Sequence, residues 1–537
     1  MKDDSPLPSS DSLFKRGMHY ARMSGPGWIQ AAVTLGGGTL VSALYLGVIG
    51  GFEFLWLQPL AMLCGVIMLS ALSYITLSIQ ERPFRAAKKR VSPVLAWGWL
   101  VATVVANVVF CASQFALGTD AIQNNLGLDG NPFLITALLF LVSMTLIWQF
   151  SGKGRGAVLI DQIIKVLVAV IVLAFIAVVV LLIAKGEVAW GQIGSGLLPD
   201  FSALFHPTEA YEPFIAKAGS YGSFWSEYIV TNQRNIIIGA FGTAVGINMT
   251  FLLPYTILKR KWGKKHRELA RFDLLLGLLL PFILGASALI IASASQFHAN
   301  ESASVNEQAY HEVLDARLLE EHKGYAHYTI TQKNQLRTTV SQADKKLAIL
   351  LSKRNAKDLA VALEPFLGQW AQLIFGIGIL AMALSTMIVH MMMNGYAFSE
   401  AINKYGNRKV FFLGALIPAF MGLVSPIIWS GSIKSALVIP ASVIATTLLP
   451  IAYLIIVLLM NSRSALQSEL PRNRFAINLL MFIAMGFASF ASFWALWGKM
   501  GSPNPFERFL AIGAIVLLLV LILMGCYNFY RKEKKSL

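Results

Sequence analysis

The sequence predicts an all-α protein that crosses a membrane about twelve times, and three observations carry this prediction. Apolar residues make up 56% of the 537-residue chain and charged residues only 13%, about half the charged share of an ordinary soluble domain. Apolar runs of roughly 20 residues recur from end to end, and a helix of that length spans the hydrocarbon core of a bilayer. Basic residues gather in every second connection between these runs.

Twelve apolar spans follow one another along the chain. We expect them at residues 26–48, 55–79, 94–119, 132–150, 162–184, 235–258, 273–296, 367–395, 410–429, 435–460, 475–497 and 508–530. With twelve spans, every basic connection and both chain ends lie on one side, and the positive-inside rule makes that side cytoplasmic. We therefore expect an integral protein of the cell (inner) membrane with both termini in the cytoplasm. The net charge of +16 then faces an anionic membrane surface rather than nucleic acid.

Two long connections fall on the opposite, external side. The second is the larger, and its leucines between Thr339 and Leu363 recur at three- and four-residue steps, which predicts helices. The predicted organisation is a cytoplasmic N-terminus (1–25), helices 1–5 as a first repeat (26–184), an external loop (185–234), helices 6–7 (235–296), an external helical insertion (297–366), helices 8–10 completing a second repeat (367–460), helices 11–12 (461–530) and a cytoplasmic tail (531–537).

The first span contains three successive glycines between Thr34 and Thr39. Such a run costs a helix about 3 kcal/mol relative to alanines. At membrane depth a helix break is tolerated only where the freed backbone lines a cavity or is buried in protein. The run predicts a broken helix that faces a binding site. The alternative is a small-residue face that packs against another helix.

The sixth span is weakened in a similar way by Gly239, Gly242, Gly246, the amide of Asn248 and Pro254. The first and sixth spans are five spans apart. Two interrupted helices at matching positions of two halves indicate an inverted-repeat transporter with its substrate site at the midplane. We therefore expect a five-plus-five core with discontinuous helices 1 and 6.

Several short motifs stand where a known family carries its own. In the first span the family reads Asp-Pro-Gly-Asn, and in the sixth it reads Gly-x-x-Val-Met-Pro-His-Asn. The chain shows Gly25-Pro26-Gly27, Gly36-Gly37-Gly38-Thr39, Gly242 to Met249, Ser385-Thr386 and Leu449-Pro450 at the corresponding places. In these motifs and in the order of its spans the chain resembles the Nramp (natural resistance-associated macrophage protein) family of proton-coupled divalent metal transporters. The resemblance implies a LeuT-like fold and covers about residues 20–530 apart from the external insertion.

The resemblance is that of a divergent member. The positions of the family's aspartate, asparagine and methionine metal ligands fall at Gly36, Thr39 and Gly246. The family's acidic pair, associated with protons, falls at about Cys111 and Gln114. A dehydrated divalent cation needs anionic or strongly dipolar ligands. The usual metal-ligand and proton-path residues are thus absent, and no metal ligand can be assigned.

A polar but uncharged site remains. The predicted substrate-binding residues are Gly36, Gly37, Gly38, Thr39, Gly246, Asn248 and Gln114. Missing side chains at the glycines are expected to enlarge this site. The hydroxyl pair Ser385-Thr386 is a candidate ion site for Na⁺, as in transporters of the same fold. For any one of these residues, the alternative is an interhelical hydrogen bond of about 0.6 kcal/mol.

Two further features outside this set have simple interpretations. His390 lies about a turn from the cytoplasmic end of its span, where it either carries a proton or is an interfacial or helix-bonded histidine. Asp161 and Lys165 are four residues apart at the start of the fifth span, which predicts an ion pair at a helix end.

The leading functional hypothesis is a secondary transporter that moves a small solute by alternating access. By family the solute is a metal ion, although the usual ligands are absent. The site residues favour a neutral or zwitterionic organic solute instead, and a non-transporting receptor or sensor that uses 297–366, or a facilitative pore, are further alternatives. No enzyme motif is visible, so we expect no enzyme and no cofactor. The expected partners are the lipid bilayer, the solute or ion, and Na⁺ if transport is coupled to it, with no nucleic acid.

Overall fold

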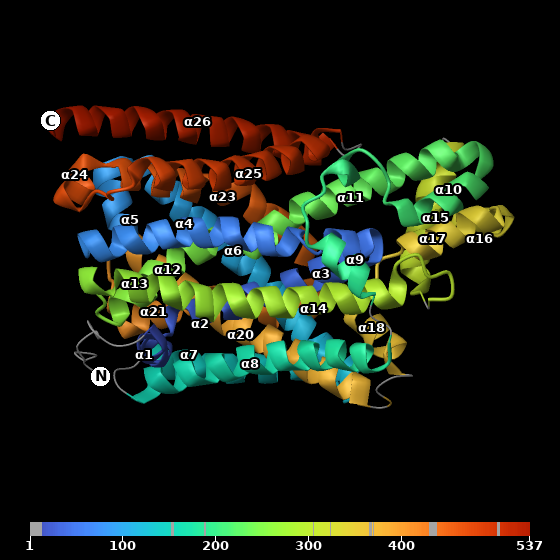
Figure 1. Cartoon of the computed structure of the whole chain (residues 1–537), viewed down its shortest axis with the longest axis horizontal. Helices are drawn as coiled ribbons and strands as arrows, with labels where there is room; N and C mark the ends of the chain where they lie inside the picture. The colour runs from blue at the N-terminus through green and yellow to red at the C-terminus, as the bar shows by residue number, and fades with distance from the viewer. Residues whose placement is uncertain are drawn as a thin grey trace.

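The computed structural model describes residues 13–151, 155–186, 189–303, 305–322, 324–364, 368, 370–428, 438–501 and 505–536, and those residues alone are discussed below. Throughout these ranges the regular structure is helical, with no strand. Figure 1 shows long helices lying side by side along the longest axis of the molecule, with a group of shorter helices at one end. Parts of the predicted segments 1–25, 367–460 and 531–537 lie outside the described residues.

The bundle consists of ten long helices and two pairs of half-helices. The long helices are α4 (Leu57–Ile79), α6 (Pro93–Asp120), α7 (Pro132–Ser151), α8 (Arg155–Ala184), α14 (Leu280–Phe297), α20 (Trp370–Ala401), α21 (Arg408–Leu423), α23 (Val438–Asn461), α25 (Arg474–Met500) and α26 (Pro505–Ser536). The half-helices are α2 (Pro26–Thr34) with α3 (Gly37–Gly50), and α11 (Gly222–Ala244) with α12 (Ile247–Lys259). Short helices connect or flank these long helices. They are α1 (Leu13–Met23), α5 (Pro83–Ala86), α9 (Trp190–Gly196), α10 (Glu212–Lys217), α13 (Arg267–Leu274), α22 (Ser425–Ile428) and α24 (Arg463–Leu466).

Local sequence explains where several of these helices begin. Proline is the first residue of α2, α6, α7 and α26, where its fixed φ suits a helix and its missing N–H leaves no bond unmade. At the start of α6, the Ser92 hydroxyl also accepts a hydrogen bond from the Leu95 N–H at 3.5 Å. The apolar composition of the following turns then allows each helix to be surrounded by other helices or by lipid.

The predicted fold class is confirmed, while the count of twelve spans is not. Ten described helical segments are long and apolar enough to cross a membrane. The expected spans 235–258 and 435–460 are not among them. The first is divided between α11 and α12, and of the second only Ala445–Asn461 stands out as a shorter apolar helix. A broken span meets these criteria of length and hydropathy only where one part of it is long enough, as Gly37–Phe54 in the first span is.

The helices at one end of the molecule form a cap, which comprises α15 (Glu307–Glu321), α16 (Ile330–Thr339), α17 (Gln342–Leu351) and α18 (Ala356–Ala362). The predicted periodic segment after Thr339 is divided between α17 and α18, because Ser341 and Asn355 each accept a hydrogen bond from a backbone N–H of the helix that follows. The indole of Trp225 in α11 donates to Asp344 at 2.6 Å and ties the cap to the bundle. The division into repeats and external segments stays a prediction.

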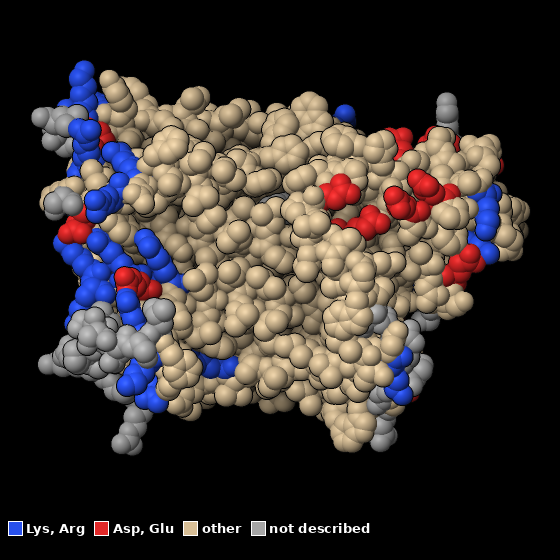
Figure 2. All heavy atoms as spheres, viewed as in Figure 1, with Lys and Arg blue, Asp and Glu red and all other residues tan. Residues whose placement is uncertain are grey.

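Lysine and arginine gather at the opposite end, which we call the basic end (Figure 2). Helix α1 and the C-terminal end of α26 both lie there (Figure 1). The basic end thus collects the connections that the sequence marks as positively charged, and the cap lies at the other end of the same helices.

A buried carboxylate fixes α2 at the basic end. Asp273 in α13 accepts hydrogen bonds from the Gly25 N–H (2.7 Å), the Gly27 N–H (2.6 Å) and the Ser24 hydroxyl (2.6 Å). A Cβ on Gly27 would collide with the backbone carbonyl of Asp273. The Gly-Pro-Gly motif therefore lets the first turn of α2 lie directly against α13.

The predicted ion pair between Asp161 and Lys165 is not formed. Asp161 pairs instead with Arg260, which also donates to the Met23 carbonyl at 3.1 Å. Lys165 donates to the Ser24 carbonyl at 2.6 Å. Residues distant in sequence supply closer partners than the helical neighbour four positions away.

Candidate functional site

Two helix breaks face each other near the middle of the bundle. Leu35 and Gly36 separate α2 from α3, and Val245 and Gly246 separate α11 from α12. Gly36 has φ −115° and ψ −170°, and Gly246 has φ −81° and ψ 160°. Both conformations are open to any L-residue, so backbone strain does not explain why these positions are glycine.

Close packing explains both glycines. A Cβ on Gly36 would lie 2.6 Å from the Thr386 Oγ1, and a Cβ on Gly246 would lie 2.5 Å from the Asn248 Oδ1. At Gly36 and Gly246, the expectation that the missing side chains enlarge the site is therefore wrong. The polar side chains of Thr386 and Asn248 occupy that space instead and are brought close to the broken backbone.

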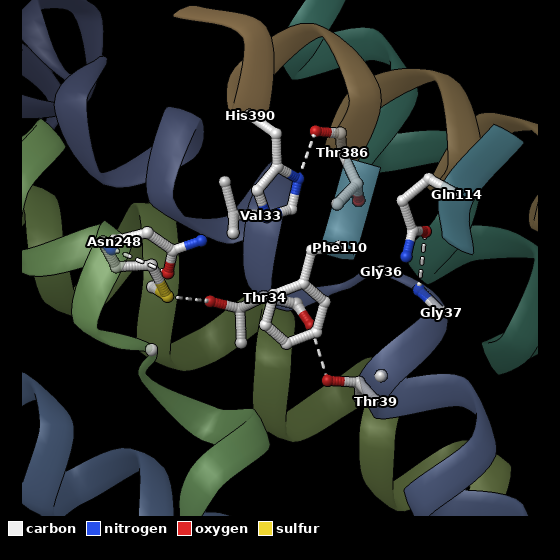
Figure 3. A pocket seen from close by; sticks show the side chains of 13 residues that line it. Val33, Thr34, Gly36, Gly37, Thr39, Phe110, Gln114, Asn248, Thr386 and His390 are labelled. Carbon is white, nitrogen blue, oxygen red and sulfur yellow. Dashed lines mark hydrogen bonds between the residues drawn. The ribbon is translucent and has the colours of Figure 1, made fainter. Parts of the chain in front are cut away.

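A small pocket lies between the two breaks (Figure 3). It is lined by Val33, Thr34, Gly36, Gly37, Gly38, Thr39, Phe110, Gln114, Gly246, Asn248, Met249, Thr386 and His390. These residues come from both broken helices and from α6 and α20. The free space inside is about 20 Å³, which is room for about one water-sized particle.

Side-chain hydrogen bonds hold the first break open. The Thr39 hydroxyl donates to the Thr34 carbonyl at 2.5 Å, and Gln114 in α6 accepts a bond from the Gly37 N–H at 3.0 Å. Thr39 therefore supplies a partner for a carbonyl at the end of α2, and Gln114 one for an N–H at the start of α3. Each of these oxygens keeps a lone pair for a further contact.

The second break carries an amide and a thioether. The Asn248 amide N–H donates to Asn107 at 3.2 Å, and its Oδ1 accepts from the Met249 N–H at 3.0 Å. The Thr34 hydroxyl lies 3.3 Å from the Met249 Sδ and 3.0 Å from the Gln30 carbonyl. Helices α2 and α12 thus contact one another directly across the pocket (Figure 3).

Helix α20 closes another side of the site. The hydroxyls of Ser385 and Thr386 donate to the Ala32 carbonyl of α2, at 3.2 and 2.8 Å. Thr386 lines the pocket and Ser385 does not. His390 also lines it and is fully buried. Of the two simple interpretations, the interfacial histidine is wrong, because α20 continues to Ala401, and the helix-bonded histidine is confirmed, because the His390 Nδ1 lies 2.8 Å from the Thr386 carbonyl oxygen.

The structure brings the whole predicted substrate-binding set into one lining, because Gly36, Gly37, Gly38, Thr39, Gly246, Asn248 and Gln114 all face this pocket. Their role in binding stays a prediction. Sequence reasoning did not place Val33, Phe110, Met249 or His390 in the site. For His390 a signal existed, since it follows Thr386 by four residues and therefore lies on the same helix face.

The pocket is polar without a formally charged side chain. None of its described lining residues is Asp, Glu, Lys or Arg. In the part of the chain that the structure describes, no three His, Cys, Asp or Glu residues are grouped as a metal site. The available donors are hydroxyl, amide and backbone oxygens, one thioether and one imidazole. A cation here would be held by dipoles and lone pairs rather than by opposite charge.

Comparison with known proteins shows which family model and which solved structures the chain is similar to. Residues 27–321 and 344–498 match the family model described as natural resistance-associated macrophage protein-like. A manganese transporter of Eremococcus coleocola, in complex with an aromatic bis-isothiourea substituted compound, superposes with a TM-score of 0.71 at 14% identity, covering 99% of this chain and 98% of the other. A mutant of that transporter gives a TM-score of 0.69 at 15% identity over 98% of both chains. No curated protein matches the sequence.

Proposed function

The chain belongs to the natural resistance-associated macrophage protein-like (Nramp) family, and we propose that it carries one divalent metal ion at a time through the central pocket. It is a secondary membrane transporter with the all-α fold and the discontinuous helices that the sequence predicts. Its surroundings are lipid and its cargo is, by family, a metal ion. Because the family consists of transporters, we infer that the chain has no catalytic activity.

The size of the pocket carries this proposal. Its free space of about 20 Å³ admits a single ion or water molecule. Pockets for organic ligands have volumes of about 300–1,000 Å³. A neutral or zwitterionic organic solute is therefore not favoured, although the uncharged lining alone would suit one.

The carbonyl ends of the half-helices that lead into the two breaks are the groups best suited to attract a cation, because the N-terminal ends of α3 and α12 at the same breaks carry the opposite partial charge. Helix α2 ends at Thr34 and α11 ends at Ala244, so the C-terminal ends of both half-helices point toward the pocket. The C-terminus of a helix carries a partial negative charge of about half an elementary charge. In transporters with discontinuous helices, such carbonyl ends coordinate cations. The oxygens of Thr39, Asn248 and Gln114 would add further ligands.

Manganese is the ion to test, because the similar structures are of a manganese transporter. We expect calorimetric titration of the purified protein with Mn²⁺ to show saturable binding that Thr39→Ala and Asn248→Ala each weaken about tenfold, the effect of about 1.4 kcal/mol. Thr145→Ala is the matched control, since its hydroxyl also bonds to a helix carbonyl but faces outward from α7. An absence of binding at millimolar Mn²⁺ and Mg²⁺ would contradict the metal assignment.

We further propose that Na⁺ couples transport at Ser385 and Thr386. The observation that favours it is the convergence of their two hydroxyls on the Ala32 carbonyl beside the first break, because hydroxyl and carbonyl oxygens are the ligands of hard cations. Replacing Na⁺ by choline should then slow Mn²⁺ uptake into proteoliposomes. Unchanged uptake would exclude this coupling.

We also propose that the basic end is cytoplasmic, in the inner membrane of the cell. The concentration of Lys and Arg at that end supports this orientation (Figure 2). A reporter fused after Leu537 should be active only in the cytoplasm. Activity on the external side would reverse the orientation.

A further inference from the structure

The imidazole of His390 lines the central pocket and has no role in the oxygen-ligand site described above. His390 belongs to α20, is fully buried and lines the central pocket together with Thr386, four residues earlier. Figure 3 shows its ring beside Thr386 and Val33, on the opposite side of the pocket from Thr39. The His390 side chain therefore lines the same pocket as the backbone of the two breaks.

Hydrogen bonding defines which ring nitrogen is available. The His390 Nδ1 lies 2.8 Å from the Thr386 carbonyl oxygen. A carbonyl only accepts, so Nδ1 carries the hydrogen and Nε2 keeps the lone pair of the neutral ring. The ring also stacks on Phe110 in α6, with centroids 5.5 Å apart and planes 17° apart. Both contacts hold the imidazole in one orientation.

The Nε2 atom has no partner among the described residues, although it is buried. A buried polar atom left without a hydrogen bond costs about 1–3 kcal/mol. Each such atom in a native structure calls for an explanation such as a bound ion or a functional role, and among the described residues with such an atom His390 is the one that lines the pocket. Here the atom belongs to a residue that lines the transport pocket.

We propose that the His390 Nε2 is a direct ligand of the transported ion and makes the site select transition metals over Mg²⁺ and Ca²⁺. This inference rests on the proposed function. A metal-binding histidine almost always donates its other ring N–H to a carbonyl, carboxylate or water, as Nδ1 does here. An imidazole nitrogen binds first-row transition metals, Mn²⁺ more weakly than Fe²⁺, Ni²⁺ or Zn²⁺, whereas Mg²⁺ and Ca²⁺ prefer oxygen ligands.

The experiment is a binding titration of the full-length protein in lipid nanodiscs with Mn²⁺ and, separately, with Mg²⁺. We expect His390→Ala to raise the Kd for Mn²⁺ at least tenfold and to change the Kd for Mg²⁺ less than twofold. His298→Ala is the matched control. His298 also bonds through Nδ1 to a carbonyl, that of Val48, at 3.0 Å, but it lies outside the pocket lining. This control should change neither Kd.

A spectroscopic measurement distinguishes direct binding of the metal by His390 from a purely structural role of this residue. Pulsed electron paramagnetic resonance of bound Mn²⁺ should show coupling to an imidazole nitrogen in the wild type and in His298→Ala, and none in His390→Ala. Should His390→Ala fail to fold, His390→Gln and the wild-type spectrum decide the question.

Distinct results would overturn the two proposals. Bound Mn²⁺ without nitrogen coupling in the wild type, or an equal loss of Mn²⁺ and Mg²⁺ affinity in His390→Ala, would refute the role of His390 as a ligand while leaving metal transport intact. A wild type that binds neither ion would refute the proposed function itself.

Discussion

The two ends of α2 contrast sharply in how they are held. At its start, the buried carboxylate of Asp273 accepts three hydrogen bonds and positively charged Arg260 lies close by. At its end, Thr34 and Gly36 belong to a pocket whose polar groups are hydroxyls, amides, a thioether, an imidazole and backbone groups, with no Asp, Glu, Lys or Arg in the lining. Charge is used to hold the helix in place and is absent where the cargo is proposed to bind.

The difference has a physical reason. A buried charge that loses its partner is costly, so a charged network resists separation. Neutral dipoles bind a cation without leaving an uncompensated charge when the ion departs. In this chain the proposed site therefore holds no unpaired charge when it is empty, whereas the fixed end of the helix keeps its carboxylate permanently paired with N–H and hydroxyl donors.

The largest expected effect comes from removing the charge that fixes α2. Asp273→Ala would leave the N–H groups of Gly25 and Gly27 and the Ser24 hydroxyl without their acceptor. We expect a loss of about 4 kcal/mol in the free energy of unfolding, measured as a lowered thermal midpoint of the purified protein. The exposed Asp129 provides the control, and Asp129→Ala should change stability by less than about 0.5 kcal/mol. A midpoint equal to that of the control would mean that Asp273 does not hold α2.

A smaller effect is expected at the uncharged end. In Gly36→Ala the new methyl group would force the Thr386 hydroxyl away from the Ala32 carbonyl. Overpacking of this kind costs about 1–3 kcal/mol of stability. Because the ion is proposed to bind where Thr386 now lies against the break, we expect the displaced hydroxyl to raise the Kd for Mn²⁺ roughly tenfold, the effect of about 1.4 kcal/mol. Gly239→Ala in α11 is matched, because a Cβ there meets nothing within 4 Å. If both variants bind Mn²⁺ equally well, the packing at the first break does not control the site.

The smallest effect is expected in the cap, away from both ends of α2. Burial by itself raises the pKa of Asp315, but hydrogen bonds from Arg337 and Tyr325 and the nearby positive charges outweigh it and hold that pKa below the ordinary value of 3.8. The ionised Asp315 therefore stabilises the folded cap fully above about pH 4. This stabilisation is lost as the pH falls through the lower pKa that Asp315 has in the folded cap. Asp315→Asn should cost the cap about 1 kcal/mol at pH 7.

Hydrogen exchange of α15 and α16 measures this effect. At pH 7, exchange should be faster in Asp315→Asn than in the wild type, while the Kd for Mn²⁺ stays unchanged. Equal protection of α15 and α16 in the two proteins would show that the Arg337–Asp315 pair contributes nothing measurable to the cap.

Part of the site was predictable from sequence because the signal is local. Three successive glycines weaken a helix wherever they occur, and the helix does break at Leu35 and Gly36. Asn248 and Gln114 were identified through the family motifs and line the same pocket as Thr39.

The contacts that the sequence did not predict depend on the tertiary structure. Met249 enters the pocket because of how α12 is rotated against α2, which no single segment determines, whereas the position of His390 four residues after Thr386 was a local signal that went unused. Likewise, the i,i+4 spacing predicts that Asp161 pairs with Lys165, but Arg260, distant in sequence, lies nearer in the fold.

The sequence by itself determined the fold class, the two broken helices and most of the residues that line the site. The fold class and the breaks follow from hydropathy and helix propensity, which act within one segment, and the lining residues outside the glycine run follow from the family motifs. Only the tertiary structure decided that the pocket has room for one ion-sized particle, that Thr386 and Asn248 fill the space beside the glycines, and that the His390 Nε2 is left without a protein partner among the described residues. Cavity volume and hydrogen-bond partners depend on the relative positions of α2, α6, α12 and α20, and those positions arise only when the whole bundle packs.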